Sequence, residues 1–345
     1  MAVFGRRLNI IMQKNNPMSK NRFFTLVDNF DFPLSLGYSD KTLFAGSCFS
    51  ERIGARMQQF KYPVQINPHG VIFNPHSLAA SISSVLDNRQ LGVEDLESHQ
   101  GLYLSLQHHS VFNRPDSQEV ISGINEATSS AHTFLKNASV IFFTFGTAWA
   151  YQHKDSQEIV ANCHKIPQQA FDKVLLDLDT MTQQWTTLLK SLRAFNPNLK
   201  FVFTVSPVRH WKDGAIENQQ SKSALVTLAH RLVHKVEQCL YFPSYEIMVD
   251  ELRDYRFYDR DLVHPNALAI DIIWERFAER VFSEKDMEIQ RLISKLNTAL
   301  QHRKMQDNKE ELKKFKSFGE DTISKIEGLD QSIDLDREKA FFSAL

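Results

Sequence analysis

Short apolar runs alternate along the chain with segments whose apolar residues recur every three or four positions. The apolar runs predict strands at about 41–46, 63–67, 138–146, 200–208 and 245–252. Helical spacing predicts helices at about 49–60, 76–88, 118–136, 221–240 and 266–282, and a long one from Phe171 to the Asn196-Pro197 pair. Strands that alternate with helices in this way indicate a largely parallel sheet between two layers of helices.

The runs at 138–146 and 200–208 are almost continuously apolar, which is typical of strands covered on both faces. Between them, residues 149–162 have the pattern of a hairpin with its turn near Asp155. We therefore expect a three-layer α/β/α sandwich with a mostly parallel sheet over residues 21–283. A flexible segment at 1–20 is expected to precede it.

The composition changes after residue 283, where charged residues dominate. Apolar residues there still follow helical spacing, namely Ile289, Leu292, Ile293, Leu296 and Leu300. Residues 284–345 are expected to form a charged helical extension that packs on the α/β domain or on a second copy of the chain, which would make a homodimer. Acidic residues interspersed among the basic ones argue against a nucleic-acid arm.

The chain of 345 residues has a formal net charge of −1, which gives no global electrostatic reason to expect nucleic acid or an anionic membrane as a partner. Its three cysteines, Cys48, Cys163 and Cys239, show no C-x-x-C spacing, which fits a reducing compartment. No apolar run approaches the roughly 18 residues of a membrane helix. The first residues lack the apolar core of a signal peptide, so the sequence predicts a cytoplasmic protein.

Polar residues follow the predicted strand ends. Ligands of a parallel sheet between helices bind beyond the carboxyl ends of its strands. The residues at these positions are Gly46-Ser47, Gly146-Thr147, Ser206-Pro207 and the segment after Leu252. The sequence therefore predicts a binding or catalytic site at this edge of the sheet.

The stretch TLFAGSCFSERIG, residues 42–54, places two nucleophilic side chains at a predicted strand-to-helix turn. Free N–H groups at the start of the helix would suit a developing oxyanion beside Ser47, but Ser47 is equally suited to be only the N-cap. Cys48 is intrinsically the better nucleophile. Its side chain is expected to leave the turn in another direction and to pack behind it, so Ser47 is the predicted nucleophile.

Asp261 and His264 lie three residues apart in the loop before the predicted helix at 266–282. At this spacing the carboxylate can accept a hydrogen bond from the imidazole Nδ1–H, which fixes the tautomer and leaves Nε2 free as a general base. The pair follows the last predicted strand, in a chain that has a serine at the end of its first strand. This combination predicts nucleophilic catalysis.

Other candidate residues have weaker patterns. Cys163 and His164 are adjacent ligands without a second pair, so no metal site is expected there. His164 and Lys165 are expected at the rim of the pocket. Arg209 and His210 directly follow a predicted strand end, where they either bind a carboxylate or phosphate of the substrate or form a surface ion pair.

An early Gly-x-Ser strand end with a late Asp-x-x-His resembles the SGNH (GDSL-like) hydrolase superfamily. The chain is more similar still to the GSCFA family, whose signature here reads Gly46-Ser47-Cys48-Phe49-Ser50, with Ser50 where alanine is usual. Further similar segments are NPHGVIFNP (67–75), FGTAWAY (145–151), VANCHKIP (160–167), SPVRHWKDG (206–214) and the stretch 241–265. The resemblance spans roughly residues 20–300 and implies the SGNH fold, with its flavodoxin-like strand order.

By this resemblance Ser47 matches the nucleophile of the superfamily, and Asp261 and His264 match the other two members of its triad. The backbone N–H of Ser47 or Cys48 would be one oxyanion donor. The N–H of Gly70 would be the second.

The third oxyanion donor of the superfamily is an asparagine, and this chain has Ala148 at the equivalent position. Loss of one such donor typically costs about 10²–10³ in rate. Asn162 is the predicted replacement, and Asn74 is a weaker one.

These residues together predict a serine esterase that acts on an O-acyl ester, such as an acylated carbohydrate. An O-acyltransferase with the same triad and a non-catalytic binding protein on the same scaffold are the alternatives. Neither reaction requires a cofactor, and none is expected. The predicted partner is a small-molecule or carbohydrate ester, with no nucleic acid and no membrane.

Overall fold

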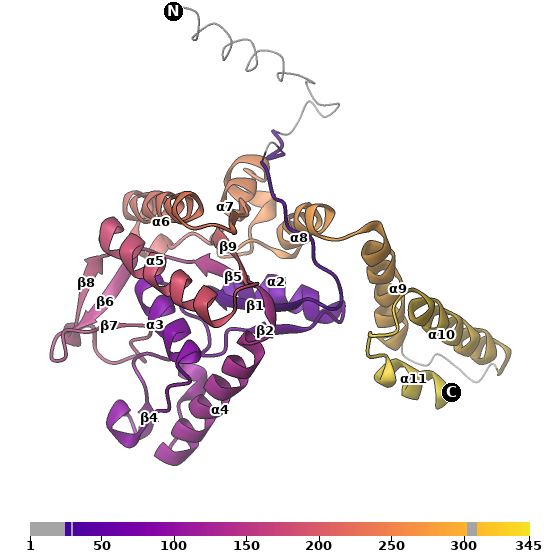
Figure 1. The fold of residues 1–345 in the computed structure, drawn as a ribbon, viewed down its shortest axis with the longest axis horizontal. Coiled ribbons are helices and arrows are strands. Elements are labelled where there is room, and N and C mark those ends of the chain that lie inside the picture. The colour runs from indigo at the N-terminus through magenta and orange to yellow at the C-terminus, as the bar shows by residue number, and fades with distance from the viewer. Residues whose placement is uncertain (1–24, 29, 302–308) are drawn as a thin grey trace, which may run out of the picture.

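The computed structural model describes residues 25–28, 30–301 and 309–345, so the predicted flexible segment at 1–20 lies outside the described residues. Its centre is a five-stranded parallel sheet (Figure 1). The strands are β1 (Lys41–Gly46), β2 (Val64–Ile66), β5 (Ala138–Phe145), β9 (Lys200–Val205) and β10 (Cys239–Tyr241), in the order β10-β9-β5-β1-β2. This is the flavodoxin-like order, which confirms the predicted topology.

Helices cover both faces of the sheet, as predicted for a three-layer sandwich. One face packs against α3 (Pro75–Leu86), α4 (Ser117–Leu135), α5 (Leu178–Phe195) and α6 (Ala215–Lys235). The other packs against α2 (Cys48–Gln59) and α8 (Ala267–Val281), while α9 (Glu284–Gln301) lies beyond α8 and not over the strands (Figure 1). Successive side chains of a strand point to opposite faces of the sheet. Leu43 is therefore buried among the helices of the first face and Phe44 among those of the second.

Two smaller sheets lie outside the central one. β3 (Glu97–His99) and β4 (Leu102–Leu104) form a hairpin. β6 (Trp149–His153), β7 (Ile159–Val160) and β8 (Phe171–Leu175) form an antiparallel sheet, of which β6 and β7 are the predicted hairpin. The prediction that a helix begins at Phe171 is wrong, because β8 precedes α5 and the Asp177 carboxylate caps α5 by accepting from the Thr180 N–H at 2.8 Å.

The predicted strand at 245–252 is also wrong. These residues form the short helix α7 (Ser244–Glu246) and a π-helical turn, Ile247–Glu251. Their buried side chains, Ile247, Met248, Glu251 and Leu252, recur at helical spacing, and the buried Glu251 pairs with Arg276 of α8. The last strand of the sheet is the three-residue β10, which lies within the end of the helix predicted at 221–240.

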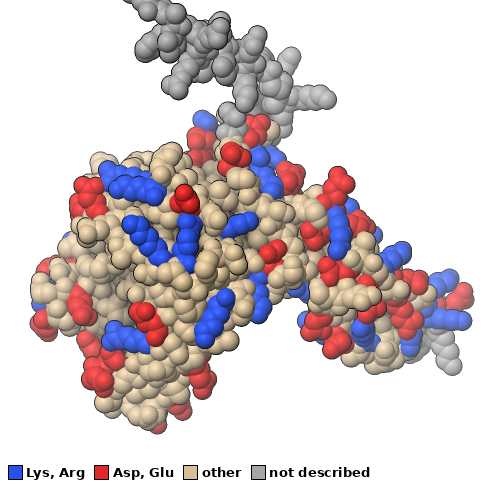
Figure 2. Space-filling view, viewed as in Figure 1, with Lys and Arg blue, Asp and Glu red and all other residues tan. Residues whose placement is uncertain are grey.

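The C-terminal helices α9, α10 (Lys309–Leu329) and α11 (Asp336–Ser343) form the predicted helical extension (Figure 1). Ile289, Leu292, Ile293 and Leu296 of α9 lie in a buried cluster that also contains residues of α2, α8, α10 and α11, so this apolar stripe is buried within the chain itself. The homodimer remains a prediction. Acidic and basic side chains are interspersed on the face shown in Figure 2, over these helices as well. No helix among the described residues has the length and apolarity that a membrane crossing requires.

Candidate functional site

The end of β1 delivers Ser47 to the N-terminus of α2. Gly46 has a φ of 132°, and a Cβ there would lie 2.2 Å from the Thr144 carbonyl oxygen of the neighbouring β5, so only glycine fits. Ser47 is the N-cap of α2 and is 1% exposed. Its Oγ accepts from the Phe49 N–H at 3.3 Å, and its own N–H donates to Thr144 O at 3.1 Å. The Ser47 N–H is therefore already engaged.

A cavity of about 620 Å³ lies at the carboxyl edge of the sheet, where the sequence predicts the site. The loops that follow β1, β5 and β9 contribute to its lining, as does the loop before α8. The lining residues from these loops include Cys48, Thr147, Ser206, Arg209, His210, Asp261 and His264.

Asp261 and His264 form the predicted pair. The Asp261 Oδ2 and His264 Nδ1 atoms are 2.6 Å apart, and Asp261 Oδ1 accepts from the N–H groups of Val263 and His264. Hydrogen bonds from the His264 N–H, the Val263 N–H and the imidazole lower the pKa of Asp261 to about 2. Because an ionised carboxylate only accepts, Nδ1 carries the proton and Nε2 of the neutral ring remains free as a base.

The loop that carries this pair is closed by the backbone. The Asp259 N–H donates to His264 O at 2.7 Å, and Tyr258 forms a β-bridge with Pro265. Asn266 caps α8 and donates from its amide to Tyr258 O at 3.2 Å. These contacts hold His264 at the mouth of the cavity, where its side chain is 41% exposed.

Ser47 and Cys48 differ in their relation to the cavity. Within the described residues, Ser47 Oγ forms no hydrogen bond with His264 and does not line the cavity, whereas Cys48 does line it. The expectation that Cys48 packs behind the turn is therefore wrong, because Ser47 as N-cap turns its own side chain back onto the helix. Burial raises the pKa of the Cys48 thiol, with a smaller opposing effect from Arg52, so the thiol stays protonated at neutral pH.

Four other predicted residues also line the cavity, namely Asn74, Asn162, Arg209 and His210. Asn74 caps α3, and its amide donates to Val160 O at 3.2 Å and to the Ser77 hydroxyl at 3.0 Å. Its hydrogen bonds are thus used within the fold. Asn162 accepts from the His164 N–H at 2.9 Å through Oδ1, and its Nδ2 forms no hydrogen bond within the described part of the chain.

Gly70, His164 and Lys165 do not line the cavity. The Gly70 N–H donates to Asn67 O at 2.7 Å in a tight turn, so it is not free to bind an oxyanion. His164 is buried with its Nε2 on Ser105 O at 2.9 Å. Lys165 is exposed to solvent. Among the described residues, no group of three or more His, Cys, Asp or Glu side chains is arranged to hold a metal ion.

The model of the GSCFA family matches residues 41–277, which include the β1 turn and the Asp261–His264 loop. The chain belongs to the GSCFA family. A search of curated protein sequences finds no match to it.

Among solved structures, this GSCFA-family chain is similar to three esterases. A carbohydrate esterase family 3 protein from Talaromyces cellulolyticus is 10% identical, with 74% of this chain and 99% of that one covered and a TM-score of 0.35. The acetyl xylan esterase Est2A from Butyrivibrio proteoclasticus is 10% identical, with 71% of this chain and 64% of that one covered and a TM-score of 0.36. A Clostridium thermocellum family 3 carbohydrate esterase is 10% identical, with 73% of this chain and 97% of that one covered and a TM-score of 0.31. The family assignment rests on the sequence, and the strand order on the structure itself.

A completely buried lysine beside the site of this GSCFA-family protein is not among the residues predicted from the sequence. Lys222 of α6 is completely buried, and its ammonium donates to the carbonyl oxygens of Gly146 at 2.7 Å and Ser206 at 2.8 Å. These two residues directly follow β5 and β9. A sequence signal existed, because Lys222 lies on the buried stripe of the helix that continues with Leu225 and Leu228, where a lysine is unusual.

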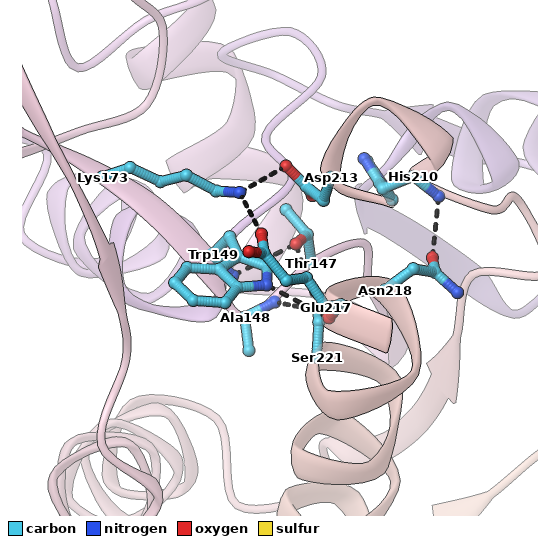
Figure 3. Close-up of polar contacts among 9 residues, drawn as sticks. All are labelled: Thr147, Ala148, Trp149, Lys173, His210, Asp213, Glu217, Asn218 and Ser221. Carbon is cyan, nitrogen blue, oxygen red and sulfur yellow. Dashed lines mark hydrogen bonds and ion pairs between the residues drawn. The ribbon is translucent and has the colours of Figure 1, made fainter. Parts of the chain in front are cut away.

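The start of α6 also holds the loops that form one wall of the cavity (Figure 3). Ser221 Oγ accepts from the Ala148 N–H at 2.7 Å and lies 3.1 Å from Thr147 Oγ1. Asn218 Oδ1 accepts from the His210 N–H at 2.8 Å. One helix face thus fixes the segments after both β5 and β9.

Charges on this wall are partly neutralised. Lys173 forms ion pairs with Asp213 at 2.8 Å and with Glu217 at 2.7 Å, and its ammonium lies 4.4 Å from the centre of the Trp149 ring (Figure 3). Burial, assisted by the nearby positive charge of Lys222, lowers the pKa of His210 to about 3. His210 is therefore neutral at physiological pH.

Proposed function

We propose that this GSCFA-family protein hydrolyses O-acyl esters, such as acylated carbohydrates, with Ser47 as the nucleophile and His264 as the general base. The observation that supports this proposal is the Asp261–His264 pair. It lies in a cavity at the edge of the sheet where β1 ends in a serine, and its hydrogen bonds leave Nε2 free to accept a proton.

In this mechanism Ser47 Oγ attacks the ester carbonyl carbon while His264 Nε2 takes the hydroxyl proton. The tetrahedral intermediate then expels the alcohol, which receives that proton from His264, and an acyl-enzyme remains. Water attacks the acyl-enzyme with His264 again as base, and the acid and free Ser47 are released. Ser47 Oγ has to leave the Phe49 N–H for this step, and such hydrogen bonds often rearrange when substrate binds.

The oxyanion needs donors other than those that the family resemblance implies. The N–H groups of Ser47 and Gly70 already have acceptors, and Ala148 has no side-chain amide. The Cys48 N–H, in the first turn of α2, has no acceptor within its helix. We assign it, together with Nδ2 of Asn162, as the donors. The prediction for Asn162→Ala is a loss of about 10²-fold in rate.

A fluorophosphonate probe followed by intact-mass measurement tests the nucleophile directly. One adduct is expected on the wild type and on Cys48→Ser, and none on Ser47→Ala. An adduct that is retained in Ser47→Ala and lost in Cys48→Ser would show that Cys48, and not Ser47, is the nucleophile.

A non-catalytic binding role is the second candidate. It is favoured by Ala148, which removes an expected donor, and by the use of Ser47 Oγ as a helix cap. Folded protein that gives no adduct with the probe over a wide pH range would support this role and contradict the esterase.

A further inference from the structure

Arg209 occupies the junction of two cavities. It lines the site cavity and also a second cavity of about 450 Å³ that is lined by Tyr255 and Tyr258, among others. Trp211, Asp261 and Val263 are likewise common to both. The backbone N–H of Arg209 donates to Val263 O at 3.2 Å, which ties this residue to the loop of His264.

The Arg209 guanidinium has its hydrogen-bonding groups available. Its central carbon lies 5.0 Å from the centre of the exposed Trp211 ring. Within the described residues it forms no ion pair and no side-chain hydrogen bond. A guanidinium offers five N–H donors in a planar fork that matches a carboxylate or a phosphate. A half-buried Arg209 in this state is suited to a ligand anion.

Lys222 places a second positive charge behind the same cavity. Its two acceptors are neutral carbonyls, the Tyr245 ring lies 5.8 Å from its ammonium, and no carboxylate of the described residues pairs with it. Burial lowers the pKa of Lys222 to about 7, with a smaller opposing effect from Cys48 and a smaller assisting one from Arg209. A buried ammonium without a counter-charge is costly, and an anion bound nearby would reduce that cost.

The acidic groups at the cavity form no ion pair with these two cations among the described residues. Asp261 is ionised, but its oxygens accept from His264 and Val263, and Asp213 pairs with Lys173. Lys212 adds another positive charge to the lining. The region around Arg209 is therefore the part of the cavity best suited to a negatively charged group.

We propose that the cavity binds a carboxylate or phosphate group of its ligand, held by the guanidinium of Arg209 and stabilised by the buried ammonium of Lys222. This deepens the proposed function and rests on it in one respect only, namely that the cavity is the substrate site. The substrate would then be an ester that carries a separate acidic group.

Titration calorimetry with succinate, inorganic phosphate and neutral glycerol tests the anion site without any catalytic step. The wild type is expected to bind at least one of the two anions and not glycerol. Arg209→Gln should weaken that binding about 10- to 100-fold, since charge-assisted hydrogen bonds are lost. The affinity of Arg209→Lys for the anion should lie between those of the wild type and Arg209→Gln, because lysine keeps the charge but lacks the planar fork of N–H donors.

The exposed Lys165, which does not line the cavity, provides the control. Lys165→Gln should bind each anion with the same affinity as the wild type. Equal binding by Arg209→Gln and the wild type, or no anion binding by the wild type, would overturn the proposal. A preference for succinate over phosphate, or the reverse, identifies which acidic group the site takes.

Lys222→Met should weaken anion binding several-fold and abolish the proton uptake that is expected when the wild type binds an anion near pH 7. Should this variant not fold, the wild type and the three variants above still decide whether the cavity binds an anion through Arg209. Unchanged affinity and unchanged proton uptake in folded Lys222→Met would remove Lys222 from the site.

A pair of nitrophenyl esters separates this proposal from the esterase itself. Arg209→Gln should lower kcat/KM for the acidic succinate monoester about 10-fold more than kcat/KM for the neutral butyrate ester. Equal losses for both esters would contradict the substrate class. Anion binding that depends on Arg209, without any probe adduct on Ser47, would retain the anion site and reject the esterase.

Discussion

Two groups of histidines in this protein have opposite environments. His264 is 41% exposed, lies at the cavity and has an ionised carboxylate on its Nδ1. His69 and His108 are buried, with ring centres 4.6 Å apart, and their neighbours are hydroxyl groups. His69 lies 2.8 Å from the Ser81 hydroxyl and 2.9 Å from that of Thr128, and His108 lies 2.8 Å from that of Ser105.

The difference shows that the surroundings of an imidazole determine its role. Burial lowers the pKa of His69 to about 4, and burial together with His69 and His164 lowers that of His108 to about 2. Both rings are therefore held neutral as structural hydrogen-bonding groups. His264 alone of the three combines solvent access with a carboxylate that stabilises its imidazolium, so it is the one suited to proton transfer.

The largest effect is expected from His264→Ala. It should reduce the rate of fluorophosphonate labelling about 10³- to 10⁴-fold, because the serine loses its base. The free energy of unfolding should change little, since the side chain lies at the mouth of the cavity and is 41% exposed. Denaturant unfolding measured beside the labelling rate checks both statements, and normal labelling would remove His264 from the mechanism.

The opposite pattern is expected for His69→Ala. This change leaves a cavity and removes the partner of the buried Ser81 hydroxyl, while the Thr128 hydroxyl keeps only its bond to Ile124 O. It should lower the free energy of unfolding by about 3 kcal/mol, as measured by urea denaturation. Folded His69→Ala should still be labelled at the wild-type rate at low temperature. A selective loss of labelling would show that the buried histidines take part in the chemistry.

Much of this arrangement follows from the sequence. The apolar runs that end in Gly46 and Gly146 correctly predict β1 and β5, and the Asp261–His264 spacing predicts a contact that forms within one loop. Such features depend on neighbours in the chain. By contrast, the engagement of the Gly70 N–H and the burial of Lys222 arise from tertiary packing.

Two of the wrongly assigned segments have different causes. The stretch 245–252 has β-branched and aromatic residues, yet its burial pattern is helical because α8 packs against it. The strand β10 has only three residues, too few to show any period. The position of Cys48 at the cavity likewise depends on how Ser47 turns as the N-cap, which a sequence pattern does not determine.

Acid should destabilise the fold through the buried histidines. In the unfolded chain they take up protons below about pH 6.5, whereas folded His69 and His108 do so only near their lowered pKa values. The unfolded state thus binds more protons, and stability falls as the pH falls below 6.5. The expected loss at pH 5 is about 2 kcal/mol for each of the two.

Urea denaturation between pH 7 and pH 5 measures this slope. Asp261, with a pKa of about 2, stays ionised throughout and does not contribute to it. A His108→Gln variant should lose the part contributed by His108, about 2 kcal/mol between pH 7 and pH 5, and keep that of His69 and of His210, whose pKa is also lowered. A free energy of unfolding that stays constant from pH 7 to pH 5 would mean that these rings are not held neutral.

The smallest effect concerns Asn266, which links the loop of His264 to α8. Its Oδ1 accepts from the Ala269 N–H at 3.1 Å, while its Nδ2 donates to Arg256 O at 2.7 Å and Tyr258 O at 3.2 Å. Asn266→Ala should lower the free energy of unfolding by about 1 kcal/mol through loss of the cap. Asn266→Asp keeps the cap and loses the two bonds to the loop, so it should retain more stability and still slow labelling several-fold. If Asn266→Asp is labelled as fast as the wild type, the backbone contacts of the loop are sufficient to position His264, and the exposed histidine is as rigidly held as the buried pair.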